Sequence, residues 1–152
     1  MKKIMFVCTG NTCRSAMAEG ILKKLLNEKN MKDIKVYSCG IYANTGMHAT
    51  DESIKAVEEL YNIDILSHKA TNISESNIRD MDLILCATNE HKRAAKYLYP
   101  EIAEKIYTMK EYAGEKNIEN MSISDPWGYT MEVYKKCAKE IYETILKIVE
   151  KL

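Results

Sequence analysis

The segment from residue 8 to residue 15 combines a thiol and a guanidinium at the spacing of one short loop. Its residues are Cys8, Thr9, Gly10, Asn11, Thr12, Cys13, Arg14 and Ser15. An activated cysteine is a strong nucleophile, and an arginine side chain donates two parallel hydrogen bonds to phosphate oxygens. With Cys8 beneath the phosphorus atom and Arg14 on the oxygens, the spacing predicts cysteine-based phosphoryl transfer.

The flanking residues predict a strand before this segment and a helix after it. The apolar run 4–7 precedes it, and Met17, Ile21 and Leu25 follow at helical spacing. Backbone N–H groups of a tight loop and of a helix N-terminus converge on oxyanions. The residues expected to bind phosphate in this way are Thr9, Gly10, Asn11, Thr12, Cys13 and Ser15.

The remaining sequence predicts alternating strands and helices. Further strands are expected at 34–38, 83–87 and 106–109, a loop at 40–46, and helices at 50–62, 88–99 and 130–152. This order implies an α/β fold, in which right-handed crossovers give a four-stranded parallel sheet with helices on both faces. Ligands bind beyond the carboxyl ends of such strands, which is where the segment after residue 7 emerges.

The composition indicates one globular domain spanning residues 1–152, which we expect to be a cytoplasmic monomer. Of its 152 residues, 46% are hydrophobic and 29% are charged. The 22 lysines and arginines balance 22 aspartates and glutamates, which argues against a nucleic acid partner. The sequence shows no membrane span and no secretory signal, so its five scattered cysteines fit a reducing compartment.

The segment from Val7 to Ser15 resembles the signature of the low-molecular-weight protein tyrosine phosphatases. It follows a predicted strand at the N-terminus, and Asp125, Pro126 and Trp127 stand near the C-terminus, as they do in that family. The length and the order of elements extend the resemblance over residues 1–152. It implies a phosphatase that acts on phosphorylated proteins, releases inorganic phosphate through a phosphocysteine at Cys8 and needs no cofactor.

Asp125 is the expected general acid of this reaction. A carboxylic acid can protonate the leaving group and later accept a proton from the attacking water. An isolated Asp-Pro pair is usually an ordinary turn, but the resemblance assigns the general acid to this dipeptide. Pro126 keeps the backbone of Asp125 extended, and Trp127 can form a wall of the pocket.

The resemblance also implies a set of supporting side chains. Asn11 is expected to adopt a strained backbone conformation, held by Ser38 and His68. Asparagine tolerates left-handed geometry, so this role for Asn11 also follows from its residue type. Ser15 is expected to donate a hydrogen bond to the Cys8 thiolate, to cap the following helix, or to do both.

The two other histidines, His48 and His91, are expected to lie at the surface or to cap helices.

Substrate choice rests on fewer residues. At position 12 the loop resembles that of the bacterial protein arginine phosphatases, which carries threonine at the same place. The hydroxyl of Thr12 suits the polar guanidinium of phosphoarginine. Tyr42 and Trp127 are the expected walls of the substrate pocket. Ala16 replaces a proline common in both branches, and Tyr129 also suits phosphotyrosine. Phosphoarginine is therefore favoured, with phosphotyrosine as the alternative.

The remaining cysteines raise a redox question. The family resemblance implies that Cys8 and Cys13 can form a reversible disulfide that protects the nucleophile. Cys39, Cys86 and Cys137 fit core positions, and no cysteine has metal-ligand spacing with a histidine.

Three other functions fit the sequence less well. A thioredoxin-coupled arsenate reductase would use Cys86, but it needs a second shuttle cysteine that 87–99 lacks. A non-catalytic redox or phosphoprotein-binding module has no need of a thiol and an acid together. A nucleotide-binding loop would place Gly-Lys-Ser or Gly-Lys-Thr after Gly10, and no such sequence is present.

Overall fold

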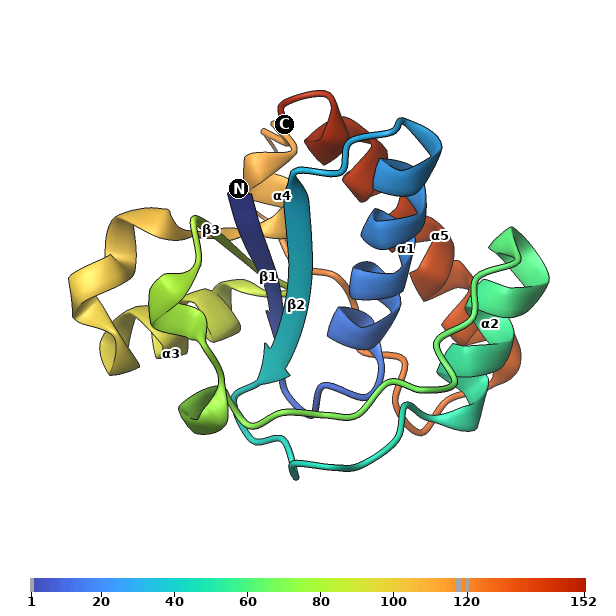
Figure 1. Cartoon of the computed structure of the whole chain (residues 1–152). Coiled ribbons are helices and arrows are strands. Elements are labelled where there is room, and N and C mark those ends of the chain that lie inside the picture. The colour runs from blue at the N-terminus through green and yellow to red at the C-terminus, as the bar shows by residue number, and fades with distance from the viewer. Residues whose placement is uncertain (1, 117–118, 120) are drawn as a thin grey trace.

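Four parallel strands form the single sheet of this protein in the computed structural model, which describes residues 2–116, 119 and 121–152. The order across the sheet is β2-β1-β3-β4, so β1 has a neighbour on each side (Figure 1). The predicted fold class is confirmed. The strands are β1 (Lys2–Cys8), β2 (Ile34–Gly40), β3 (Leu83–Cys86) and β4 (Ile106–Thr108).

Helices cover both faces of the sheet. Figure 1 shows α1, α2 and α5 on one side of the strands and α3 on the other. The α-helices are α1 (Arg14–Glu28), α2 (Asp51–Tyr61), α3 (Asn89–Leu98), α4 (Met109–Tyr112) and α5 (Met131–Val149). Short 3₁₀ turns occupy Ile73–Glu75, Ile78–Asp80 and Pro100–Lys105.

Strand β1 is buried on both faces because its side chains alternate between two cores. Ile4, Phe6 and Cys8 belong to the core under α1 and α5, whereas Met5 and Val7 belong to the core under α3. A continuous apolar run suits such a central parallel strand. The alternation points Cys8, the last residue of β1, toward the α1 face.

The residues predicted to begin three of the helices, and the one predicted to end α2, do so in the structure. Thr50 caps α2 by accepting a hydrogen bond from the backbone N–H of Ser53, and Asn62 ends it in the left-handed conformation with φ 55°. Thr88 and Thr130 cap α3 and α5 in the same way as Thr50.

The boundary between β4 and α4 differs from the prediction. The expected strand 106–109 ends at Thr108, and Met109 already begins α4. Thr108 and Glu111 form a capping box, in which each side chain bonds the backbone N–H of the other residue. This local signal terminates the strand despite the apolar character of Met109.

None of the helices built from the described residues combines the length and hydropathy that a membrane span requires.

Candidate active site

The loop that joins β1 to α1, called loop 8–15 below, turns its carbonyl oxygens toward neighbouring chain segments. The oxygens of Cys8, Thr9 and Thr12 accept hydrogen bonds from the backbone N–H groups of Ile41, Tyr42 and Thr50, at 2.9, 2.9 and 3.0 Å. The N–H groups of residues 10–13 donate to no acceptor in the described part of the chain. The loop therefore keeps backbone donors for an anion.

Asn11 shapes this loop from within. It is fully buried and left-handed, with φ 57°. Its Nδ2 donates to Ser15 Oγ at 2.7 Å and to Ser38 Oγ at 2.9 Å, and its Oδ1 accepts from the N–H of Thr71 at 2.9 Å. His68 Nε2 donates to its carbonyl oxygen at 2.7 Å. The structure thus brings Asn11, Ser38 and His68 together as predicted, and these contacts offset the cost of the left-handed backbone.

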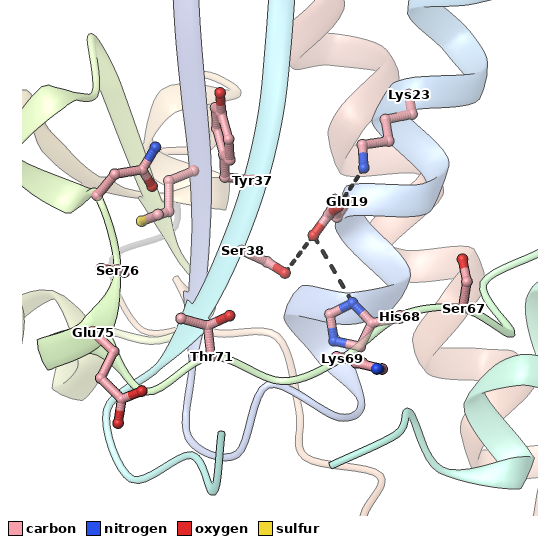
Figure 2. A pocket seen from close by; sticks show the side chains of 12 residues that line it. Glu19, Lys23, Tyr37, Ser38, Ser67, His68, Lys69, Thr71, Glu75 and Ser76 are labelled. Atoms are coloured by element: carbon pink, nitrogen blue, oxygen red, sulfur yellow. Dashed lines mark hydrogen bonds and ion pairs between the residues drawn. The ribbon is translucent and has the colours of Figure 1, made fainter. Parts of the chain in front are cut away.

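A carboxylate supports the same network from α1. Glu19 Oε1 accepts from Ser38 Oγ at 2.5 Å and lies 4.0 Å from His68 Nδ1 (Figure 2). Glu19 also pairs with Lys23 one turn along the helix. A polar cavity of about 470 Å³ opens beside these residues. This cavity therefore borders the supporting network rather than the thiol, and its lining includes no residue of loop 8–15.

A smaller cavity of about 250 Å³ is lined by the predicted catalytic residues. Cys8 lies at its base with 2% of its surface exposed, and its sulfur is 2.8 Å from Ser15 Oγ. Since Ser15 Oγ accepts from Asn11, its own hydrogen is free to donate to the sulfur. The lining residues are Cys8, Thr9, Gly10, Thr12, Cys13, Arg14, Asp125 and Trp127.

Ser15 does not cap α1, so that alternative role is wrong. The helix begins at Arg14 and Cys13 occupies the cap position, without a side-chain hydrogen bond. The Ser15 hydroxyl, in the first turn of α1, instead lies between Asn11 Nδ2 and Cys8 Sγ.

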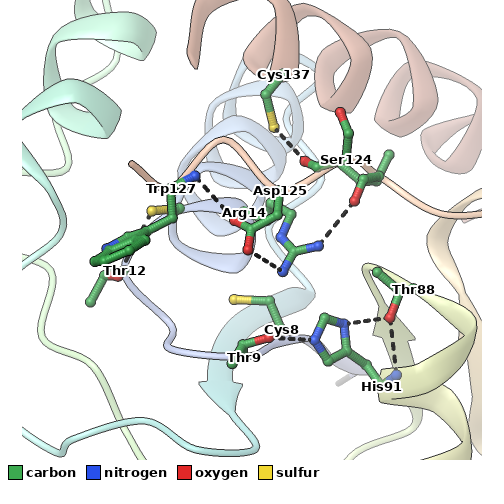
Figure 3. A network of polar contacts seen from close by, with 12 residues as sticks. Cys8, Thr9, Thr12, Arg14, Thr88, His91, Ser124, Asp125, Trp127 and Cys137 are labelled. Atoms are coloured by element: carbon green, nitrogen blue, oxygen red, sulfur yellow. Dashed lines mark hydrogen bonds and ion pairs between the residues drawn. The ribbon is translucent and has the colours of Figure 1, made fainter. Parts of the chain in front are cut away.

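Arg14 and Asp125 meet at this cavity (Figure 3). The Arg14 side chain is buried, with Nη1 donating to the carbonyl of Ile123 at 3.0 Å and Nη2 lying 3.8 Å from Asp125 Oδ2. The Asp125 side chain is 57% exposed, and its Oδ1 accepts from the N–H of Trp127 at 3.1 Å. Because Asp125 is exposed and the separation is 3.8 Å, this pairing leaves the carboxylate free to face a ligand.

One residue at this site was missed by the sequence analysis. His91 is 8% exposed, and its Nε2 lies 2.8 Å from Thr9 Oγ1 while its Nδ1 lies 2.9 Å from Thr88 Oγ1. Burial, with the charge of Arg14, lowers the pKa of His91 to about 4. Its backbone N–H is capped by Thr88, but its ring is buried against loop 8–15 rather than at the surface. Its place in the first turn after β3 was the available signal, because that turn lies at the same sheet edge as Cys8.

Of the two residues predicted to form walls of the substrate pocket, one lines the cavity and the other does not. Trp127 lines the cavity, whereas Tyr42 is outside its lining, with 78% of its surface exposed. Cys13 lines the cavity, and its sulfur lies 3.5 Å from Tyr134 Oη and 3.7 Å from Thr50 Oγ1.

The three other cysteines occupy the core positions predicted for them. Cys39, Cys86 and Cys137 are buried. Burial raises the pKa of Cys39 and of Cys137 to about 12, and raises that of Cys86 far above its usual range. A neutral buried thiol is a poor nucleophile, so Cys86 does not suit the shuttle role of an arsenate reductase.

Known proteins resemble this chain over its whole length. A sequence model described as low molecular weight phosphotyrosine protein phosphatase matches residues 3–152. A protein-arginine-phosphatase of Bacillus subtilis is 30% identical, covering 98% of this chain and 95% of its own. A crystal structure of a low molecular weight protein tyrosine phosphatase from T. tengcongensis is 40% identical with a TM-score of 0.92, and all of both chains is covered.

A further solved structure bears on the chemistry of the loop. It is a cysteine-to-serine mutant of the YwlE arginine phosphatase with a phosphorylated active-site serine. That protein is 30% identical to this chain with a TM-score of 0.89, and 99% of this chain and 95% of the other are covered.

Replacing Gly40 with alanine should damage the anion site. A Cβ atom there would lie 2.5 Å from the carbonyl oxygen of Thr9 and 2.9 Å from the nitrogen of Asn11, so loop 8–15 must shift. We expect inorganic phosphate to bind at least about tenfold more weakly in a ³¹P NMR titration, with about 1–3 kcal/mol lost from the free energy of unfolding.

Gly20→Ala is the matched control. Its Cβ would lie 2.6 Å from a methyl group of Ile65, away from the loop, so it should lose stability and retain phosphate affinity. Equal phosphate affinity in Gly40→Ala and the parent would contradict the prediction.

Proposed function

The chain belongs to the low molecular weight phosphotyrosine protein phosphatase family, and from this premise we propose that its chemistry runs through loop 8–15 and Asp125. The protein is a cysteine-based phosphatase that acts on phosphorylated proteins. The observation that carries the proposal is the contact of 2.8 Å between Cys8 Sγ and Ser15 Oγ, inside a cavity that Arg14 and Asp125 also line.

The first step forms an S–P bond. The Ser15 hydroxyl and the positive end of α1 stabilise Cys8 as a thiolate, which attacks the phosphorus in line with the leaving group. Arg14 and the free N–H groups of residues 10–13 bind the equatorial oxygens, where charge accumulates. As the bond from phosphorus to the leaving group breaks, Asp125 transfers its proton to that group.

The second step releases inorganic phosphate. Asp125, now a carboxylate, accepts a proton from a water molecule that attacks the phosphocysteine. The S–P bond breaks, its electron pair returns to Cys8, and the site is restored. The phosphorylated serine of the YwlE mutant supports attack from the position that Cys8 occupies in this chain.

Two substitutions test the assignment of nucleophile and acid. Cys8→Ser should lower turnover of phosphotyrosine and phosphoarginine peptides at least about 1000-fold, since a serine hydroxyl stays protonated. Asp125→Asn should lower kcat about 100-fold to 1000-fold with little change in KM, because it removes proton transfer and leaves binding intact. Steady-state release of inorganic phosphate measures both.

Asp64→Asn is the matched control for the acid. Asp64 is exposed and accepts from the N–H of Leu66, two residues on, as Asp125 does from Trp127, but it lies outside the site. It should retain parental kcat. Turnover by Cys8→Ser equal to that of the parent would contradict the mechanism.

For the substrate we propose phosphoarginine, with phosphotyrosine as the second candidate. Thr12 lines the cavity beside Cys8, and among the described residues the one polar contact of its hydroxyl is a long one of 3.8 Å, with the Cys13 sulfur. That hydroxyl is available to the polar guanidinium group. The exposed Trp127 at the cavity wall favours the second candidate, since an aromatic face also packs against a tyrosine ring.

Thr12→Ile tests this choice. Removing the hydroxyl and adding apolar bulk should lower kcat/KM for a phosphoarginine peptide about tenfold or more relative to a phosphotyrosine peptide of the same sequence. Thr45→Ile, at an exposed threonine outside the cavity, should leave the ratio unchanged. An unchanged ratio in Thr12→Ile would assign selectivity to the pocket walls instead.

We also propose that Cys13 protects Cys8 in a reducing cytoplasm, the compartment that five unpaired cysteines favour. Peroxide oxidises the Cys8 thiolate to a sulfenic acid, and the Cys13 thiol attacks that sulfur to form a disulfide with loss of water. Both residues line one cavity. Reductant then restores both thiols.

Cys13→Ser should therefore recover less activity than the parent when dithiothreitol follows a peroxide pulse. The control is Cys137→Ser, in which a hydroxyl can keep the hydrogen bond from residue 137 to the Ser124 carbonyl. Full recovery of Cys13→Ser would refute the protective role.

A further inference from the structure

Both nitrogens of the His91 ring make polar contacts, one with loop 8–15 and one with the cap of α3 (Figure 3). On one side Nε2 lies 2.8 Å from Thr9 Oγ1, and on the other Nδ1 lies 2.9 Å from Thr88 Oγ1. Thr9 follows Cys8 directly and lines the same cavity, whereas His91 is buried behind it and does not line it. The imidazole therefore touches a residue of the cavity without reaching the position of a bound phosphate.

The hydrogen bonds of Thr88 favour one of the two tautomers of the His91 ring. Thr88 Oγ1 already accepts from the backbone N–H of His91 at 3.0 Å, so its own hydrogen is available to Nδ1. When Nδ1 accepts, Nε2 of a neutral ring must carry the hydrogen and donate it to Thr9 Oγ1. The hydroxyl hydrogen of Thr9 is then free for an acceptor in the cavity.

The surroundings keep this ring neutral near pH 7. Burial is the main cause of the lowered His91 pKa of about 4, the positive charge of Arg14 adds to it, and Asp125 opposes it weakly. A neutral ring has one N–H group, and the ring keeps this charge state throughout the physiological range.

We propose that His91 is a positioning residue that orients the Thr9 hydroxyl as a hydrogen-bond donor to the phosphoryl group above Cys8. This inference rests on the proposed function. The donor chain runs from the Thr88 hydroxyl to Nδ1, and from Nε2 to Thr9. Without the ring, Thr9 is free to rotate its hydrogen away from the phosphate oxygen, so a donor prepared for the transition state is lost.

A double-mutant cycle tests the coupling between the two residues. Thr9→Val removes the hydroxyl at nearly constant shape, and His91→Phe removes the ring nitrogens. Each should lower kcat/KM about tenfold to 150-fold, the range expected for one hydrogen bond to a charged group. The double variant should be no slower than the slower single variant, because both remove the same donor. If the losses of the two single variants multiplied in the double variant, the inference would be overturned.

A conservative substitution at His91 and a substitution at a remote histidine serve as controls. His91→Gln keeps an amide N–H in reach of Thr9 and should retain more activity than His91→Phe, which a purely space-filling role would not produce. His48→Phe, at an exposed histidine outside the cavity, should match the parent. Equal losses in His91→Gln and His91→Phe would count against a donor role.

The tautomer can be measured in the parent protein, independently of whether the variants fold. Two-bond ¹H–¹⁵N NMR correlations should show Nε2 protonated and Nδ1 unprotonated between pH 6 and 8. A hydrogen on Nδ1 would overturn the inference. An inactive parent would refute the proposed function itself, whereas an active parent with an Nδ1 hydrogen would refute only the role of His91.

Discussion

The site depends on one buried asparagine in a left-handed conformation. Asn11 uses both hydrogens of its side-chain amide, one on Ser15 and one on Ser38, and these bonds hold the turn of loop 8–15. Because Ser15 accepts from Asn11, the Ser15 hydroxyl has its hydrogen left for the sulfur of Cys8. The backbone conformation of one residue therefore determines the hydrogen bond that the proposed nucleophile receives.

The strand order explains why residues far apart in sequence reach this loop. With β1 between β2 and β3, the carboxyl ends of three parallel strands meet at one edge of the sheet. Ser38 comes from β2, Cys8 ends β1, and Thr88 with His91 follows β3. The loop is consequently supported on both sides by side chains from neighbouring strands, and a shift in the register of β1 would break both sets of contacts at once.

The sequence was sufficient where local patterns decide structure and insufficient where single long-range contacts do. Loop 8–15, its strand and its helix followed from residue types and periodicity. Ser38 and His68 lie 27 and 57 residues from Asn11, so only resemblance could connect them to it. His91 has no pattern of its own, because a lone histidine in a first helical turn suits a surface position equally well. The fold was predictable from repeated weak signals, and the supporting contacts were not.

The contacts that support loop 8–15 are charged on one side and neutral on the other, and this difference bears on the release of phosphate. Glu19 anchors one side of the loop with a carboxylate, while His91 contacts the other as a neutral ring. Arg14 already supplies a buried cation beside the proposed phosphate position. A second cation at His91 would bind substrate and product phosphate more tightly alike, and such uniform binding slows release without lowering the chemical barrier. A neutral donor acting through Thr9, as proposed above, would add direction without adding charge, and would thereby favour the transition state over the bound ground states.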